Sequence, residues 1–475
     1  MHSYFYFCVT VLIAVFSYSC VSSHEISTPF DQELILVSSD DCYQVVTNNS
    51  IKSILVNEVV FFGSEICHSA KIDYISFSDE KINTTFYVQS KLQVISDNGT
   101  HLWLNQPSAV YYKGVFERVY FAYSNTLGQV IVRYYDYTSN DFSEEVVLAT
   151  FSKFDDHLSP SILVLNEGGR KGQIVIAYSF HSSPLFFSYS TTPENINSFV
   201  PPVEILSRPT TYPNLIESGQ NLSIYFRGHP VDVPSSRGVL QRINTVDLMQ
   251  WSEVFDVIKF NQGEYIYHKI NTKEGRILLG WSVFSKKSRK FSNAYFSYSD
   301  DNGVTWNYFD TKAGVWGVTH LLTDEIPVLL NGEQIRVYDL AVFSNRFYIS
   351  ATKYHREYTC CGDLVESIIL KLSDGVEMSS FNSNTEYYAS GAIFDSETEG
   401  VVYSVLNIDN KNSIIFRYLD QELKTLVKGP IYSTDKMFGR LLGVKNKKYL
   451  GEIGFIEIEK YRSYLDFESK LMILK

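Results

Sequence analysis

The stretch SDDNGVTW, residues 299–306, decides the fold of this 475-residue chain. Ser299 and Thr305 frame a tight turn in which Asp301 can accept backbone N–H bonds. Gly303 can take a positive φ in that turn without steric cost. The ring of Trp306 is large enough to be buried between neighbouring sheets. The stretch therefore predicts two β-strands joined by a turn whose side chains hydrogen-bond to its own backbone. A buried aromatic residue follows the turn.

Apolar segments repeat along the chain at a regular spacing. The segment VYFAYS begins at Val119 and is echoed by IVIAYS, which begins at Ile174. Similar segments begin at Leu222, Ile277, Phe347, Val402 and Tyr449. The mean spacing of these seven starts is about 55 residues, and repeats near this length with several short strands are typical of propeller blades.

We therefore predict an all-β, seven-bladed β-propeller, with six or eight blades as alternatives. Leu222, Ile277 and Val402 should each begin an inner or second strand of a blade. Residues 24–118 should supply outer strands or a partial blade that closes the ring. The aromatic share of 15% fits this class, because aromatic side chains favour pleated, half-buried surfaces.

The N-terminus has the pattern of a secretory leader. An apolar run extends from Tyr4 to Phe16, and the small residues Val21 and Ser23 follow it. We predict a signal peptide over residues 1–23 and a single propeller domain over residues 24–475. The apolar run is too short for a membrane span, so we expect a secreted, extracellular protein without membrane insertion.

Four cysteines remain after the leader: Cys42, Cys67, Cys360 and Cys361. In an oxidising compartment we expect a disulfide, and we predict the pair Cys42–Cys67. A zinc site of Cys360, Cys361 and His355 is the alternative use of the other two cysteines. Sequons for a glycoprotein occur at Asn48, Asn83, Asn98 and Asn221.

The formal net charge of −12 excludes a general attraction to nucleic acid or to anionic membranes. A locally basic cleft is compatible with that total. A protein partner and a structural metal ion stay open, and the pattern calls for no catalytic cofactor.

A longer series of motifs points to a known family. SDDNGVTW fits the Asp-box pattern S-x-D-x-G-x-T-W, which joins the third and fourth strands of sialidase-type blades and lies away from active sites. The other motifs are WLNQPSAVYYKG (103–114), VYFAYS (119–124), DDHLSPSI (155–162), AYSFH (177–181), PLFFSYS (184–190), TYPN (211–214), YFRG (225–228) and EYIYH (264–268). Their order and spacing resemble the BNR-repeat family, which includes seven-bladed polysaccharide lyases of the ulvan-lyase type. Gln106 departs from that family, whose members often carry an acidic residue before this proline.

The resemblance implies a set of site residues. It gives His157, His181, Tyr212 and Arg227 as catalytic residues, and Tyr265 and Tyr267 as substrate-binding residues. Such a lyase removes the C5 proton of a uronate and expels the C4 oxygen. Arg227 can neutralise the carboxylate with a bidentate pair, while a His and a Tyr exchange protons. We predict that His157 and Tyr212 form the proton-transfer pair and that His181 orients the substrate or shares that role.

Each motif also has a purely structural interpretation. Asp155-Asp156-His157 can be a capped turn, Arg227 can be a solvated turn residue or part of an ion pair, and Tyr212 can simply pack. The predicted function is a secreted lyase acting on an anionic, uronate-containing polysaccharide. The alternatives are a non-catalytic propeller that binds a glycan or a protein, and a sialidase-like glycosidase. The last fits worse, because it needs an early arginine and the first arginine of the chain is Arg118.

Overall fold

The computed structural model describes most of the chain from residue 92 onward. The described segments are 92–102, 104–229, 238–260, 264–354, 365–373, 375–383, 391–394, 401–408, 411–419, 426–434, 437–447, 453–463 and 465–474, together with the strands between residues 26 and 86. The predicted leader, Cys360, Cys361 and His355 lie outside them. In these segments, helical structure is limited to two short 3-10 turns, η1 (Asp156–Leu158) and η2 (Gly168–Arg170). No helix among them is long and apolar enough to cross a membrane.

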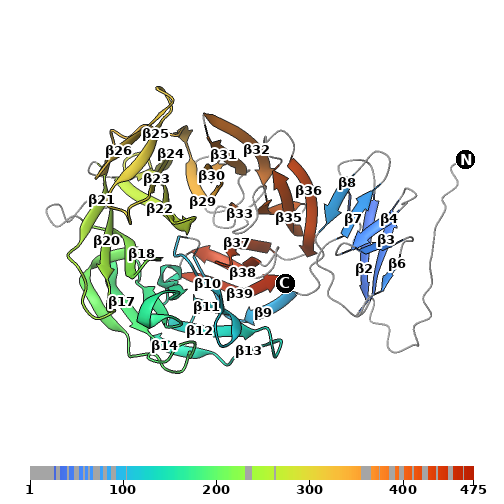
Figure 1. Cartoon of the computed structure of the whole chain (residues 1–475), viewed down its shortest axis with the longest axis horizontal. Coiled ribbons are helices and arrows are strands. Elements are labelled where there is room, and N and C mark those ends of the chain that lie inside the picture. Colours follow the sequence, from blue (N-terminus) through green and yellow to red (C-terminus); the bar gives the residue numbers. More distant parts are fainter. Residues whose placement is uncertain are drawn as a thin grey trace, which may run out of the picture.

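The strands before residue 90 pair with one another in two antiparallel sheets, which Figure 1 draws beside the ring. One sheet contains β1 (Ile26–Ser27), β2 (Glu33–Ser39), β3 (Cys42–Thr47) and β6 (Glu65–Cys67). The other contains β5 (Val59–Phe61), β4 (Ser53–Val56), β7 (Ile75–Ser78) and β8 (Asn83–Phe86). Cys42 and Cys67 are direct partners in the register of β3 and β6. Directly opposed antiparallel residues have a Cα separation that suits a disulfide, and that bond stays a prediction.

The remaining strands form a ring of curled sheets (Figure 1), whose strand pairs are antiparallel except for the parallel pair of β21 and β27. The first sheet contains β10 (Ala109–Lys113), β11 (Glu117–Ser124), β12 (Gln129–Asp136), β13 (Asp141–Phe142) and β14 (Val146–Thr150). Next, an eight-stranded sheet contains β15 (Ser161–Val164), β16 (Ile174–Tyr178), β17 (Ser183–Tyr189), β18 (Val203–Ser218), β19 (Asn221–Gly228), β20 (Val239–Thr245), β21 (Phe255–Lys259) and β27 (Leu322–Thr323). The third contains β22 (Glu264–Lys273), β23 (Arg276–Ser285), β24 (Lys290–Ser299), β25 (Trp306–Asp310), β26 (Val315–Thr319) and β28 (Leu330–Glu333).

Three four-stranded sheets complete the ring. They contain β29 (Ile335–Phe343), β30 (Arg346–Tyr354), β31 (Val365–Leu372) and β32 (Val376–Ser383); β33 (Ala392–Phe394), β34 (Val401–Ile408), β35 (Lys411–Leu419) and β36 (Leu426–Thr434); and β37 (Met437–Gly443), β38 (Ile453–Ser463), β39 (Asp466–Leu474) and β9 (Leu92–Ser96). Strand β9 precedes the first sheet of the ring in the sequence but pairs with β39, so it supplies the fourth strand of the last sheet.

The first strands of successive sheets line the centre of the ring. β10, β15, the second half of β18, β22, β29, β33 and β37 contact one another in that order. The circle closes where Tyr111 N of β10 donates to Lys445 O, just after β37, at 2.9 Å. The apolar core lies between neighbouring sheets, where side chains such as Leu279, Trp281 and Ile349 are fully buried.

The turn at residues 299–306 has the predicted structure. Asp301 Oδ1 accepts hydrogen bonds from Val304 N at 3.1 Å and Thr305 N at 2.8 Å, and Ser299 Oγ accepts from Gly303 N at 2.8 Å. Gly303 has a φ of +80°. Trp306 is fully buried and lies edge-on to Tyr225 of β19, with ring centroids 6.4 Å apart, so it packs between two neighbouring groups of strands.

The all-β propeller is confirmed. The second strands β19, β23 and β34 begin one residue before Leu222, Ile277 and Val402, as the repeat predicted. The blade count of seven stays a prediction, because β18 runs through two successive groups of strands and joins them into one sheet. The boundaries of a single domain over residues 24–475 also stay a prediction.

Candidate active site

His157 lies in η1, directly before β15. Asp155 caps this turn by accepting a hydrogen bond from His157 N at 2.8 Å. The ring atom Nδ1 lies 2.5 Å from Asp155 Oδ1 and 3.0 Å from Asp156 Oδ1. Burial lowers the pKa of His157, but the hydrogen bonds and charges of the two carboxylates outweigh burial and raise it to about 9. The ring therefore carries a proton at neutral pH.

Arg440 of β37 anchors this cluster from the other end of the chain. Its Nη2 lies 2.6 Å from Asp156 Oδ2, and both side chains are almost completely buried. Burial raises the pKa of Asp156, but the charge of Arg440 and the contact with His157 hold it below its usual value. The buried group balances two cations, Arg440 and His157, against the carboxylates of Asp155 and Asp156, as buried charges require.

Tyr212 lies where β18 changes partners. The first half of β18 pairs with β17 and the second half pairs with β19, with an irregular register between Thr211 and Asn214. Tyr212 has a φ of +59°, which is uncommon for a bulky residue. This backbone brings its ring over His157, with centroids 5.4 Å apart and planes 22° from parallel. Strained backbone of this kind concentrates at functional sites.

A buried amide supports the turn at Tyr212. Asn214 Nδ2 donates to Tyr212 O at 2.8 Å and to Leu104 O at 2.9 Å. It also lies 3.1 Å from Nε2 of His268. Burial, with the nearby charges of Arg227 and Lys269, lowers the pKa of His268 to about 3, so this histidine is neutral and Nε2 can accept.

Arg227 of β19 lies directly across the strand pair from Thr211, which precedes Tyr212. Its side chain is buried under three rings: Cζ lies 4.5 Å from the centroid of Tyr212, 4.9 Å from Tyr267 and 5.7 Å from Tyr265. Among the described residues, no carboxylate forms an ion pair with it, and Nε and Nη1 have no hydrogen-bond partner. A buried guanidinium without an anion is costly unless a ligand supplies one.

Tyr265 and Tyr267 lie on one face of β22, next to Tyr212, and the rings of Tyr212 and Tyr267 are 5.7 Å apart. Burial raises the pKa of Tyr267, but the charge and hydrogen bond of Arg227 and the charge of His157 prevail and lower it. Burial and the neighbouring Tyr267 instead raise the pKa of Tyr212 well above its usual value. The two phenols are therefore unequal: Tyr267 loses its proton more easily.

His181 forms the exposed side of the cluster. It follows β16 and precedes β17, and its ring stacks on His157 with centroids 4.6 Å apart and planes 18° from parallel. Lys286 adds a further cation nearby, with Nζ 4.8 Å from the Tyr265 centroid. The structure thus brings all six predicted residues, His157, His181, Tyr212, Arg227, Tyr265 and Tyr267, into one group, whereas their roles stay predictions.

Metal binding is a second use to consider for the same group. The ligand atoms of Asp155, Asp156 and His157 lie within 4.8 Å of one another. A metal would need a neutral imidazole, but the two carboxylates hold the proton on His157, and Arg440 already binds Asp156. The arrangement fits a proton donor better than a metal site.

Comparison with known proteins agrees with this geometry. Residues 118–341 match the model of a family described as a BNR repeat-containing family member. These residues belong to the BNR-repeat family. No curated protein matches the chain in sequence.

Two solved structures share the propeller fold. One is an ulvan lyase of a polysaccharide lyase family called PL25, with a TM-score of 0.64 at 13% identity, covering 80% of this chain and 95% of that one. The other is the polysaccharide lyase Uly1, with a TM-score of 0.54 at 12% identity, covering 82% of this chain and 99% of that one. At such identities the likeness establishes the propeller fold alone.

Sequence reasoning missed several residues of the site. Asp155 and Asp156 were assigned only to a capped turn, although two carboxylates beside a histidine are a signal for a raised histidine pKa. Arg440 lies 284 residues from its partner Asp156, and nothing near it in the sequence marks the pairing. Asn214 stood inside the motif TYPN, but its contact with His268 required the folded ring.

Proposed function

We propose that this protein is a polysaccharide lyase that cleaves a uronate-containing anionic glycan by β-elimination. One observation carries the proposal. Arg227 is a buried cation whose Nε and Nη1 lack partners among the described residues, and it lies within contact distance of the residues that could move protons. A uronate carboxylate would supply this guanidinium with an anion and with an acceptor for its unpartnered Nη1.

The first step is removal of the C5 proton. Binding of the carboxylate to Arg227 withdraws electrons from C5 and makes this proton more acidic. Tyr267 is the better acceptor, because Arg227 and His157 lower its pKa. Tyr267 accepts this proton in its ionised form, and binding of the substrate carboxylate to Arg227 makes that form more basic. The C5–H electrons then form the C4=C5 double bond.

The second step is release of the C4 oxygen. The C4–O bond breaks as the double bond forms, and the leaving oxygen takes up a proton. His157 is charged at neutral pH and stacks on both Tyr212 and His181, so it is the donor that we assign, either directly or through the hydroxyl of Tyr212. This assignment differs from the sequence prediction, in which His157 and Tyr212 were the base and the acid: here both belong to the acid side, and the base is Tyr267.

Polysaccharide substrates occur outside the cell, which agrees with the predicted signal peptide. A signal peptide over residues 1–23 would deliver the protein outside the cell, where polysaccharides occur, and an exposed His181 would meet the polymer first. The two lyases with the same fold support a glycan substrate. The cations Arg227, His157 and Lys286 would attract an anionic chain to this end of the ring despite the net charge of −12.

The test is incubation of the purified full chain with ulvan, heparin and chondroitin-type polysaccharides. β-Elimination creates an unsaturated uronate that absorbs at about 235 nm, so the absorbance should rise with at least one substrate. Retention of the protein on immobilised polysaccharide, measured in parallel, separates binding from turnover. Retention without any rise in absorbance would favour the non-catalytic glycan-binding alternative.

A further inference from the structure

Lys286 extends the candidate active site at its outer edge. It is an exposed residue of the hairpin that joins β23 to β24. Its Nζ lies 4.8 Å from the ring centroid of Tyr265, and the guanidinium carbon of Arg227 lies 5.7 Å from the same centroid. The two cations are therefore no farther apart than these two distances combined, which is a span that neighbouring sugars of one chain can cover.

No carboxylate of the described residues forms an ion pair with Lys286. The acidic residue closest to it in the strand pairing is Glu264 of β22, which lies opposite Ser285. Burial and the charge of Asp324 raise the pKa of Glu264, as expected for a carboxyl group without a cation beside it. The ammonium group of Lys286 is therefore available to an anion from outside the protein.

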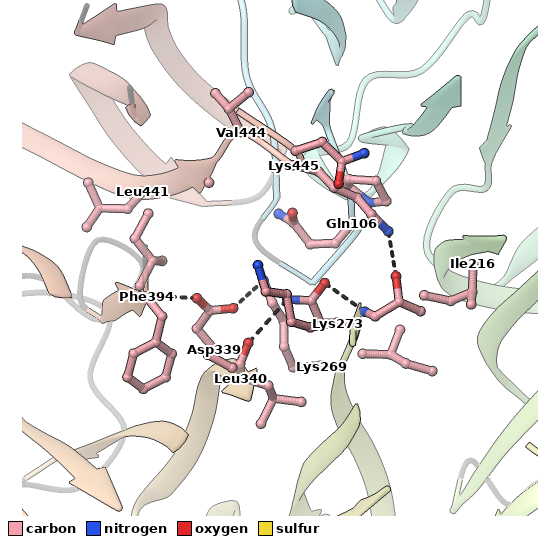
Figure 2. A pocket seen from close by; sticks show the side chains of 18 of the residues that line it. Gln106, Ile216, Lys269, Lys273, Asp339, Leu340, Phe394, Leu441, Val444 and Lys445 are labelled. Atoms are coloured by element: carbon pink, nitrogen blue, oxygen red, sulfur yellow. Dashed lines mark hydrogen bonds and ion pairs between the residues drawn. The ribbon is translucent and has the colours of Figure 1, made fainter. Parts of the chain in front are cut away.

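Lys269 shows the opposite arrangement on the same inner strand. It follows Tyr267 by two residues on β22 and lines the pocket in the centre of the ring (Figure 2). Its Nζ lies 3.8 Å from Asp339 Oδ1, so a carboxylate of the protein already balances part of its charge. Of the two lysines beside the tyrosines of β22, Lys286 is thus the one that a substrate anion can engage.

The order of the inner strands places Lys286 on the side of Arg227 that is remote from His157. His157 lies before β15, and His181 lies before β17. Arg227 lies on β19, and Lys286 lies in the hairpin after β23. Since β15, the second half of β18 and β22 contact one another in that order around the ring, the two histidines and Lys286 lie on opposite flanks of Arg227.

The chemistry of the elimination gives the polymer a direction across this row of residues. In the proposed reaction the uronate carboxylate binds Arg227, and the leaving oxygen on C4 faces His157. C1 lies at the opposite end of the pyranose ring from C4, so the sugar attached to C1 extends away from His157. That sugar, on the reducing side of the uronate, meets Tyr265 and Lys286.

We infer that Lys286, which lies against the ring of Tyr265, binds an anionic group of the sugar next to the cleaved uronate on its reducing side. The inference rests on the proposed lyase function, which supplies the direction of the chain. The anionic group is a carboxylate or a sulfate, because either offers oxygens to the three N–H donors of an ammonium group. The preferred substrate is then a polymer with negative charge on consecutive sugars, and not on alternate sugars alone.

The experiment is affinity electrophoresis of the full chain at constant ionic strength, in gels that contain polyglucuronate, unsulfated chondroitin or chondroitin sulfate. The sugar that follows each uronate carries a carboxylate in the first glycan, no charge in the second and a sulfate in the third. Lys286→Gln should weaken binding of polyglucuronate, of chondroitin sulfate or of both by about fivefold, as expected for an exposed ion pair, and should leave unsulfated chondroitin unaffected. Lys286→Arg keeps the cation and should restore the affinity.

Lys287→Gln is the matched control. Lys287 is the next residue of the same hairpin, is equally charged and exposed, and has no contact with Tyr265. This variant should bind all three glycans like the parent. A loss of affinity in Lys286→Gln for polyglucuronate alone assigns the anionic group to a carboxylate, and a loss for chondroitin sulfate alone assigns it to a sulfate. Equal effects of the two substitutions, no effect of either, or an equal loss for unsulfated chondroitin would overturn the inference.

Turnover separates this inference from the proposed function. On a polymer that the protein cleaves, Lys286→Gln should raise KM by a similar factor and leave kcat unchanged, because the contact lies away from the bond that breaks. Binding that depends on Lys286 without any elimination would contradict the lyase and keep the anion subsite. Cleavage by Lys286→Gln with the KM of the parent would keep the lyase and overturn the subsite. A parent protein that binds none of the glycans would contradict both.

Discussion

The Asp-box turn and the candidate active site are built over very different distances in the sequence. In the turn, the hydrogen bonds of Asp301 and Ser299 join residues at most four positions apart. In the site, His157, Tyr212, Arg227 and Tyr267 come from successive groups of strands, and Arg440 comes from the last sheet. The turn can form from local sequence, whereas the site exists only once the ring has closed.

The two regions also differ in how far their buried polar groups find hydrogen-bond partners. In the turn, the side chains of Ser299, Asp301 and Thr305 hydrogen-bond within the turn, and Trp306 packs in the apolar core although its indole N–H has no partner among the described residues. At the site, Arg227 keeps buried donors without partners, and Tyr212 has a strained backbone. Satisfied groups favour stability, and unsatisfied ones favour a ligand. Substitutions should therefore separate the regions: those in the turn change stability, and those in the site change turnover.

The largest expected effect is that of Arg227→Ala on turnover. Loss of the cation that neutralises the carboxylate should lower kcat by about a thousandfold or more, with a smaller rise in KM, because the interaction strengthens in the transition state. Initial rates of uronate elimination measure it. Arg227→Lys keeps the charge without the bidentate geometry and should retain part of the rate. Arg289→Ala, at an exposed arginine, is the control. An Arg227→Ala protein as active as the parent would remove the basis of the proposed mechanism.

Trp306→Ala should have the largest effect on stability. It removes a fully buried ring between two groups of strands and should cost about 3–5 kcal/mol in the free energy of unfolding. Denaturant unfolding monitored by circular dichroism measures this. Val304→Ala, at an exposed position of the same turn, should change stability by less than about 0.5 kcal/mol. Equal midpoints for the Trp306 variant and the parent would contradict the packing of this ring between the sheets.

Gly303→Ala sharpens the same contrast on a smaller scale. At a φ of +80° an alanine is strained, and its Cβ would also meet the side chains of Arg242 and Tyr225, so we expect a loss of about 2 kcal/mol. Gly275→Ala is the matched control, because Gly275 has a φ of +76° with open space around the added Cβ. It should cost less. The difference between the two unfolding free energies isolates the contacts of the turn.

The smallest expected effect is that of Asp155→Asn on the pH dependence of turnover. This variant tests whether His157 is protonated. With its pKa raised to about 9, His157 acts as a proton donor below that pH, so kcat should fall as the pH rises through about 9. Removing one of the two carboxylates should move this alkaline limb down by about one pH unit, which is about 1.4 kcal/mol. Asparagine keeps the cap of the turn. Asp300→Asn, at an exposed ion pair, should leave the profile unchanged, and an unshifted limb in Asp155→Asn would argue against His157 as the donor.

Features built from residues close together in the sequence could be predicted, whereas contacts between distant residues could not. The turn, the repeated second strands and the grouping of His157, Tyr212 and Arg227 followed from short motifs and from a resemblance in their order. The pairing of Arg440 with Asp156 could not be predicted, because it depends on closure of the ring between distant segments. The separate pairing of β1–β8 also escaped prediction, since only β9 of the early segment joins the ring.

The most direct test of the central claim compares two products of the same reaction. Each β-elimination breaks one glycosidic bond and creates one unsaturated uronate, so new reducing ends and absorbance at about 235 nm should rise together in a ratio of one to one. The account predicts this ratio for the parent protein on a polyuronate, and neither signal for Arg227→Ala. New reducing ends without the absorbance would show hydrolysis, and would contradict the assignment of Arg227, Tyr267 and His157 to an elimination.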